Sequence, residues 1–148
     1  MRNAIDDFIK ALALAGVSLD TANIAIDDLG CPHTQKGLPS RKMAIYTFQM
    51  NGQFLKIGKA GSNSNARFRS HHYNPSRAKS NLAKSLLCDK EMAKYNLDNA
   101  NIEDWIRNNI HRIDILIDKD VDIFVLNFLE SFLHCKFKPK YEGFKNQR

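Results

Sequence analysis

Two apolar runs that meet at Asn51-Gly52 constrain the fold more than any other part of the chain. Residues 43–49 read MAIYTFQ and residues 53–58 read QFLKIG, so β-branched and aromatic side chains flank the Asn-Gly pair on both sides. Asn and Gly tolerate the positive φ angles of a tight turn, and such a pair between two strand-like runs is a strong hairpin signal. The sequence therefore predicts two antiparallel strands joined at this turn.

Helical patterns lie on both sides of the hairpin. Residues 3–15 place apolar side chains at helical spacing before Gly16, and residues 121–137 form a long apolar run that ends before Pro139. The shorter elements that we expect are helices over 21–29, from 62 or 64 to 73, over 81–87 and around Trp105, and a strand over 111–118. This order predicts an α+β fold in which a small three-stranded antiparallel sheet is flanked by helices.

The chain is expected to divide near residue 40. Residues 1–40 are interpreted as a helical N-terminal extension and connector, because two helices are followed by a turn-rich segment with prolines at 32 and 39. Residues 41–148 hold the predicted sheet and form the main domain. A chain of 148 residues is long enough to bury one hydrophobic core.

The charge balance favours an anionic partner. The chain carries 22 Lys and Arg against 16 Asp and Glu, a net charge of +6, and its pI is near 9.3. Nucleic acid is favoured over a membrane, because neither a polybasic amphipathic helix nor an apolar run of about 18 residues occurs. Three scattered cysteines and the acidic pair Asp6-Asp7 near the N-terminus predict a cytoplasmic protein without a signal peptide.

Glu130 stands out because it lies in the middle of an almost wholly apolar run, residues 121–137. A buried carboxylate costs several kcal/mol unless it is paired or bound to a metal. Asn127 and His134 lie three residues before and four residues after it, so the three would form a narrow polar stripe on one helix face. This stripe can face solvent, Glu130 can pair with a core arginine, or it can face a catalytic cleft.

Three features upstream can be explained structurally or functionally. Tyr46 lies within a predicted strand, where a core tyrosine is common. The loop 58–61, Gly-Lys-Ala-Gly, can present backbone N–H groups and Lys59 to a phosphate, although its spacing matches no known nucleotide-binding pattern. Arg67 and His71 are four residues apart and share a helix face, which is usually a solvated basic surface.

Taken in order, these residues resemble the GIY-YIG nuclease superfamily. Ala44-Ile45-Tyr46 is similar to the first motif of that family and Lys56-Ile57-Gly58 to the second. The downstream features that agree are Arg67, Glu130 within a closing helix, and the tail Pro139-Lys140-Tyr141. The resemblance covers residues 43–142. Two departures concern the chemistry: Lys56 replaces the tyrosine of the second motif, and Glu142 replaces the asparagine that usually follows the tail tyrosine.

The resemblance implies a metal-dependent endonuclease that hydrolyses phosphodiester bonds, with DNA favoured over RNA. Tyr46 would activate the attacking water, Lys59 and Arg67 would neutralise the phosphate, and His71 would assist proton transfer or contact a phosphate. Glu130 would hold one Mg²⁺ or Mn²⁺, for which a carboxylate with water ligands is suited. A tyrosine titrates near 10, so nearby cations would be needed to favour its phenolate form.

Contacts with double-stranded DNA are expected from a set of basic side chains that can reach the phosphate backbone. They are Lys56, Arg69, His72, Arg77 and Lys79. Two alternatives remain open. The replacements at Lys56 and Glu142 would also fit a nucleic-acid-binding module that has lost catalysis. The apolar N-terminal helix would fit a protein-interaction domain that forms a homodimer through it.

The register of the hairpin decides whether Lys56 can join Tyr46 in one site. With a strict two-residue turn and no bulge, 50 pairs with 53 and Lys56 faces the opposite side of the sheet from Tyr46. A three-residue loop with a bulge at Gly52 would pair 48 with 56 and place both side chains on one face. A shared site therefore predicts the bulged turn.

Overall fold

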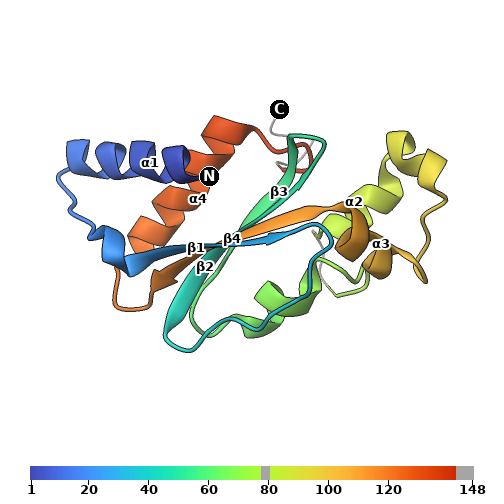
Figure 1. Cartoon of the computed structure of the whole chain (residues 1–148), viewed down its shortest axis with the longest axis horizontal. Coiled ribbons are helices and arrows are strands. Elements are labelled where there is room, and N and C mark those ends of the chain that lie inside the picture. Colours follow the sequence, from blue (N-terminus) through green and yellow to red (C-terminus); the bar gives the residue numbers. More distant parts are fainter. Residues whose placement is uncertain (78–80, 143–148) are drawn as a thin grey trace.

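A four-stranded antiparallel sheet organises the molecule, as the computed structural model shows for residues 1–77 and 81–142 (Figure 1). The strands are β1 (Ile24–Gly30), β2 (Lys42–Met50), β3 (Gln53–Ala60) and β4 (His111–Asp118), in the spatial order β1-β4-β2-β3. The α-helices are α1 (Arg2–Leu14), α2 (Leu82–Cys88), α3 (Ile102–Asn109) and α4 (Ile123–Phe137). Three short helices are η1 (Thr21–Asn23), η2 (Arg67–His71) and η3 (Lys90–Tyr95).

The α+β class and the three expected strands are confirmed, but the sheet has a fourth strand. The additional strand is β1 (Ile24–Gly30). The sequence predicted a helix over residues 21–29, which include most of this strand. Ile24 and Ile26 alternate with period two and lie opposite Ile117 and Ile115 of β4. Pairing with β4 outweighs the local helix preference of this segment, as is common for strands. Residues 1–40 therefore contribute both a helix and an edge strand to the fold.

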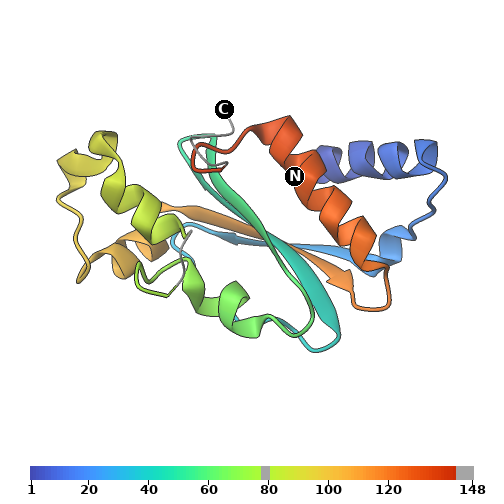
Figure 2. The same ribbon diagram turned by 180° about the vertical axis from the view of Figure 1, so that it is seen from behind.

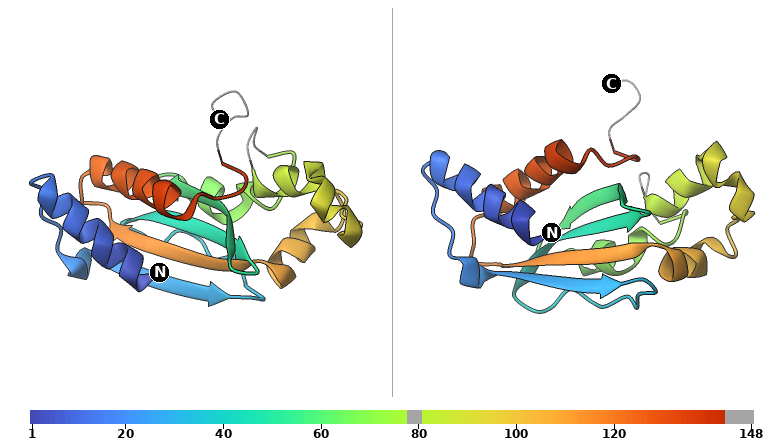
Figure 3. Two further views of the ribbon diagram at one scale, coloured as in Figure 1. Left: turned by 90° about the horizontal axis from the view of Figure 1, so that it is seen from above. Right: turned by 45° about the horizontal axis from the view of Figure 1, so that its top comes forward.

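Helices α1 and α4 lie side by side over one face of the sheet (Figure 3). Phe8 and Leu12 of α1 are buried there against Leu129 and Leu133 of α4, and the ring centroids of Phe8 and Phe128 are 5.4 Å apart. The apolar stripe of α1, which suggested a homodimer, is thus covered by α4 of the same chain. Within residues 1–77 and 81–142 no helix is long and apolar enough to cross a membrane.

The other face of the sheet carries a second core. Helices η2, α2 and α3 lie on this side and beyond one end of the strands (Figure 2). Their buried side chains include Phe68, Leu82, Leu86 and Ile106, which pack with Phe48 of β2. This second core positions the segment that follows β3, and the candidate site described below is built on that segment.

The hairpin brings Lys56 and Tyr46 to one face, as predicted, but by a different route. Asn51 and Gly52 both have positive φ, 50° and 79°, and Met50 pairs with Gln53 across a strict two-residue turn. The bulge follows inside β3: Gln49 pairs with Phe54 and Phe48 with Lys56, which leaves Leu55 as the extra residue. The expected bulge at Gly52 is therefore wrong, because Asn-Gly alone satisfies the turn.

A tail of residues 138–142 runs along the outer edge of β3 at this bulge. Lys138 ends α4 with a positive φ of 46°. The backbone N–H groups of Lys140 and Tyr141 then donate to the carbonyls of Phe54 and Leu55 at 3.0 and 2.9 Å. The Tyr141 hydroxyl donates to Asp89 at 2.6 Å. The tail thus joins the β3 edge to the helical segment 82–109.

His33 ties the connector before β2 to the second core. Its Nδ1 lies 2.8 Å from the carbonyl oxygen of Ile110, which can only accept, so Nδ1 carries the proton. Its Nε2 therefore accepts from the Tyr73 hydroxyl at 2.8 Å. Burial of the ring lowers the pKa of His33 to about 4.

This buried neutral histidine predicts that the protein loses stability as the pH falls. Between pH 6.5 and 4 the unfolded chain binds a proton at His33 that the folded chain does not, which removes up to roughly 3 kcal/mol. His72, whose pKa burial also lowers, acts with the same sign. Urea unfolding at pH 7 and pH 5 should show this loss, and His33→Gln should make the dependence shallower. His71→Gln, at a partly exposed site, is the control; equal slopes for His33→Gln and the native chain would contradict this account.

Candidate active site

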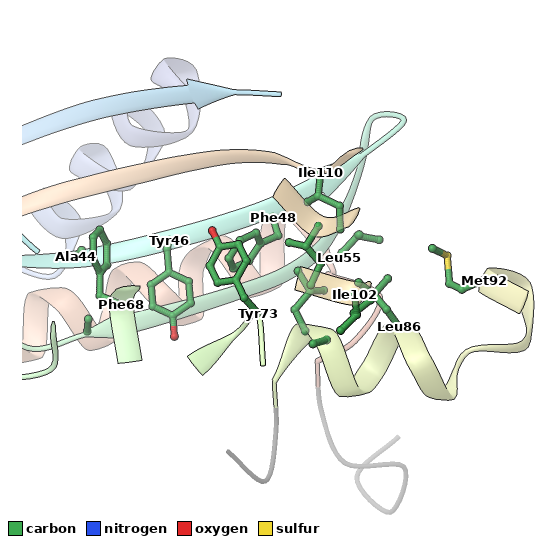
Figure 4. Packing of buried hydrophobic residues seen from close by; sticks show 14 residues of the cluster. Ala44, Tyr46, Phe48, Leu55, Phe68, Tyr73, Leu86, Met92, Ile102 and Ile110 are labelled. Carbon is green, nitrogen blue, oxygen red and sulfur yellow. The ribbon is translucent and has the colours of Figure 1, made fainter. Parts of the chain in front are cut away.

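Tyr46 is fully buried on β2, opposite Gly58 of β3. A Cβ atom added to Gly58 would lie 2.6 Å from the Tyr46 hydroxyl and 2.7 Å from its ring. The ring can lie against the β3 backbone only because residue 58 has no side chain. Figure 4 shows Tyr46 among the rings of Phe48, Phe68 and Tyr73, with its hydroxyl directed away from the strand.

The Tyr46 hydroxyl is the centre of a three-residue group, here called the Tyr46 cluster, with Arg67 and His72. Arg67 Nε donates to Tyr46 Oη at 3.2 Å, and His72 Nε2 lies 2.7 Å from the same oxygen. Burial holds the pKa of His72 well below its ordinary value, so its imidazole is neutral near pH 7. A neutral imidazole has one acceptor nitrogen, and Nε2 can therefore accept the hydroxyl proton of Tyr46.

Tyr46 experiences opposing effects on its pKa. Burial raises the pKa of the phenol, and the hydrogen bond and charge of Arg67 lower it. The charge of Glu130 also raises it, to a smaller extent. The net direction is upward, so Tyr46 is a neutral phenol at rest. Additional positive charge, from a metal ion for example, would favour the phenolate.

The segment that carries Arg67 is a π-helical turn, which changes the residue that reaches Tyr46. In a π-helix the backbone bonds join residues five apart, so residues i and i+5 lie on one side. Arg67 and His72 have this spacing. The sequence analysis assumed an α-helix and grouped Arg67 with His71. The contact with Tyr46 belongs to His72, whose side chain is buried, while His71 is partly exposed.

Glu130 of α4 forms an ion pair with Lys59 of β3. Their Oε2 and Nζ atoms are 2.6 Å apart, with 17% of the Glu130 side chain and 38% of the Lys59 side chain exposed. Glu130 is thus only partly exposed, and its partner is a lysine and not the core arginine that the sequence analysis considered. The charge of Glu130 also raises the pKa of Arg67. Lys59 lies opposite Ile45, whose side chain is in the core beneath α1 and α4, so the Glu130–Lys59 pair is on the α4 side of the β3 edge and the Tyr46 cluster is on the other face.

A second lysine–glutamate pair lies on the Tyr46 face of the sheet, where Lys56 is opposite Phe48. Lys56 Nζ is 2.8 Å from Glu142 Oε1, and only 5% of the Lys56 side chain is exposed. The charge of Lys56 helps to lower the pKa of His72, and the charge of Glu142 raises that of Arg67. Lys56 and Glu142, the two residues that depart from the GIY-YIG pattern, therefore contact each other near the Tyr46 cluster.

The donor atoms present suit a metal ion that keeps an open coordination shell. Among residues 1–77 and 81–142 no three His, Cys, Asp or Glu side chains are grouped as metal ligands. Mg²⁺ is commonly held by one or two carboxylates, with waters and substrate phosphate oxygens completing the shell. Glu130 is partly exposed and offers one such carboxylate, from which a divalent ion would have to displace the ammonium of Lys59.

The remaining predicted contacts lie on the segment after β3. Arg67, Arg69 and Arg77 are exposed, as a surface that binds a phosphate backbone requires. Lys79 lies outside the described residues. His72, also predicted to contact nucleic acid, instead lies inside the Tyr46 cluster. The sequence alone could have identified His72 only if the π-helical turn had been foreseen.

Comparisons of the chain with protein-family models, with curated proteins and with solved structures gave no match. The functional interpretation therefore rests on the geometry of the Tyr46 cluster and of the two lysine–glutamate pairs on β3.

Proposed function

We propose that the protein is a metal-dependent endonuclease that hydrolyses phosphodiester bonds in double-stranded DNA. The observation that carries this proposal is the Tyr46 cluster: a phenol bonded to a guanidinium and an imidazole. The carboxylate of Glu130, held by Lys59, acts on the pKa values of two of its members. These are the residue types expected from the resemblance: Tyr46, Arg67 and His72 contact one another, and Glu130 pairs with Lys59 at the β3 edge. The choice of DNA over RNA comes from the resemblance alone.

The residues of the site can divide the reaction among them. Arg67 is exposed and Lys59 partly so, and together they would bind the scissile phosphate and stabilise the charge that develops on its oxygens. Arg67 and a bound divalent ion would favour the phenolate of Tyr46, which would accept a proton from the attacking water, while His72 Nε2 would orient the phenol oxygen. The water oxygen bonds to phosphorus while the bond to the leaving deoxyribose oxygen breaks, and the proton taken from the water passes to that oxygen through solvent.

Glu130 would hold the divalent ion, and Lys59 would then be released to the phosphate. When bound, Mg²⁺ or Mn²⁺ supplies a Lewis acid that polarises a phosphate oxygen. Lys56 would not replace the second tyrosine of the family pattern in proton transfer, because it has no hydroxyl. Its ammonium, which is almost wholly buried and paired with Glu142, can only attract phosphate through its charge.

That pair also favours a second candidate function, a nucleic-acid-binding module without catalysis. Lys56 stands where the resemblance expects a second tyrosine, and its ammonium is paired with Glu142 rather than with the Tyr46 hydroxyl. Such a module would bind DNA through its exposed arginines and its net charge of +6. Its affinity would fall steeply with salt and would need no metal.

A plasmid assay separates the two functions. Supercoiled plasmid is incubated with the purified protein and Mg²⁺ or Mn²⁺, with EDTA as the control and duplex RNA as the competing substrate. The nuclease proposal predicts nicked and linear DNA with metal, none with EDTA, and activity that coelutes with the 16.9 kDa protein. Salt-sensitive binding without product under every metal condition would defeat it in favour of the binding module.

A further inference from the structure

Arg112 carries a charge in the least accessible part of the molecule. It lies on β4 with its side chain completely buried. Its guanidinium lies 4.7 Å from the ring centroid of Phe68, 5.5 Å from that of Phe48 and 5.9 Å from that of Tyr46. A cation removed from water is costly unless its donors are matched by acceptors, so the bonds that it makes show what it holds.

The guanidinium makes three hydrogen bonds to three different partners. Nε donates to the Asp114 carboxylate at 2.8 Å, two residues along the same strand. Nη1 donates to the Tyr73 hydroxyl at 2.9 Å, and Nη2 donates to the carbonyl oxygen of Phe68 at 3.1 Å. Asp114 balances the charge, and the other two bonds leave β4 for the segment that follows β3.

Those two bonds hold the chain directly beside the residues of the Tyr46 cluster. Phe68 follows Arg67, and Tyr73 follows His72. The rigid fork of one guanidinium thus fixes the π-helical turn at its start and just past its end. A π-helical turn is rare and less regular than an α-helix, and one of its carbonyls is here satisfied by Arg112. The spacing that brings His72, rather than His71, to Tyr46 depends on that turn.

We propose that Arg112 is a positioning residue for the site, whose guanidinium sets the π-helical turn that presents Arg67 and His72 to the Tyr46 hydroxyl. Asp114 keeps the guanidinium oriented, and Tyr73, which also donates to His33, is the second point of attachment. A buried ion pair is a poor source of stability, because apolar side chains of similar volume stabilise a core equally well. What Arg112 contributes is the placement of two side chains. The expected effect of Arg112 on catalysis rests on the proposed nuclease function. Its effect on the positions of Arg67 and His72 does not.

The test uses the full chain with Arg112→Lys and Tyr73→Phe. Lysine keeps the charge but lacks the planar fork, so it cannot hold Asp114, Phe68 and Tyr73 in the fixed geometry that Arg112 gives them. Tyr73→Phe keeps both the ring and Arg112 and removes one attachment point. Two-dimensional ¹H–¹⁵N spectra of the histidine side chains report the His72 tautomer and its titration between pH 5 and 8, without any substrate. Steady-state cleavage of a labelled DNA duplex reports kcat and KM separately.

In the native chain His72 should give one neutral tautomer near neutral pH and should titrate well below an ordinary histidine. In Arg112→Lys we expect a mixture of tautomers or a normal titration, and a kcat lowered by roughly 10²-fold, as small misplacements of reacting groups produce. KM should change by less than about threefold. Tyr73→Phe should shift the same signals with a smaller loss of kcat, and it decides the matter if Arg112→Lys does not fold.

A folded Arg112→Lys or Tyr73→Phe variant with native His72 signals would overturn the proposal, whatever its thermal stability. A native protein that cleaves no DNA would defeat the nuclease function but leave the spectra as the test of positioning. Altered His72 signals in such a protein would still support the role of Arg112.

Discussion

Replacing Tyr46 with phenylalanine is expected to lower the single-turnover rate of DNA cleavage by about 10³-fold or more, in the range that loss of a general base produces. The substitution removes only the hydroxyl that bonds Arg67 and His72 and leaves the buried ring in place. Because burial raises the pKa of Tyr46, the native rate should increase with pH between 7 and 9. The residual rate of the variant should not. A labelled duplex with saturating Mg²⁺ provides the measurement.

Tyr95→Phe is the matched control, since Tyr95 is an exposed tyrosine far from the Tyr46 cluster in the fold. It should cleave at the native rate. Cleavage by Tyr46→Phe within about threefold of the native rate, with the same pH dependence, would show that the hydroxyl takes no part in the reaction.

Gly58→Ala is expected to damage both stability and activity. The added Cβ would meet the hydroxyl and ring of Tyr46 at 2.6 to 2.7 Å. The ring is fully buried and packed against Phe48, Phe68 and His72, so it has little freedom to move aside. Overpacking of this kind typically costs about 1–3 kcal/mol. Displacement of the hydroxyl from Arg67 and His72 should reduce cleavage by about 10²-fold. Urea unfolding and the cleavage assay measure the two effects.

Gly61→Ala provides the control for Gly58→Ala. A Cβ at Gly61 would find only the Ser64 hydroxyl, at an ordinary contact distance of 3.9 Å, so stability and cleavage should change little. If Gly58→Ala behaves like Gly61→Ala, the close contact between β3 and Tyr46 does not hold the site together.

The sequence predicted the features that depend on local chemistry. Asn51 and Gly52 determine their turn through their own φ angles, and the apolar run around Glu130 identifies both a buried helix and the carboxylate on it. The shared face of Tyr46 and Lys56 was also predicted, although the bulge that creates it lies at Leu55. Leu55 is buried and its carbonyl accepts from the tail, which are tertiary contacts without a local signal.

What the sequence did not predict depends on partners distant along the chain. Residues 24–30 become a strand because β4 lies beside them. The sequence analysis grouped His71 with Arg67, but His72 contacts Tyr46 because the segment forms a π-helical turn. Arg112 of β4 holds that turn through the Phe68 carbonyl. A signal was nevertheless present: Arg112 and Asp114 occupy alternate positions of an apolar strand. Strand periodicity places both on one buried face, where a charged pair needs a structural reason.

The proposed nuclease requires the carboxylate of Glu130, which α4 carries to the β3 edge. Glu130→Gln tests it most directly, in parallel with Glu103→Gln, which changes another glutamate that pairs with a basic side chain. Duplex binding is measured by fluorescence anisotropy and cleavage by single turnover with Mn²⁺. The account predicts that Glu130→Gln binds DNA within about threefold of the native affinity yet loses cleavage by about 10³-fold, while Glu103→Gln is unaffected. Cleavage by Glu130→Gln at the native rate would contradict it.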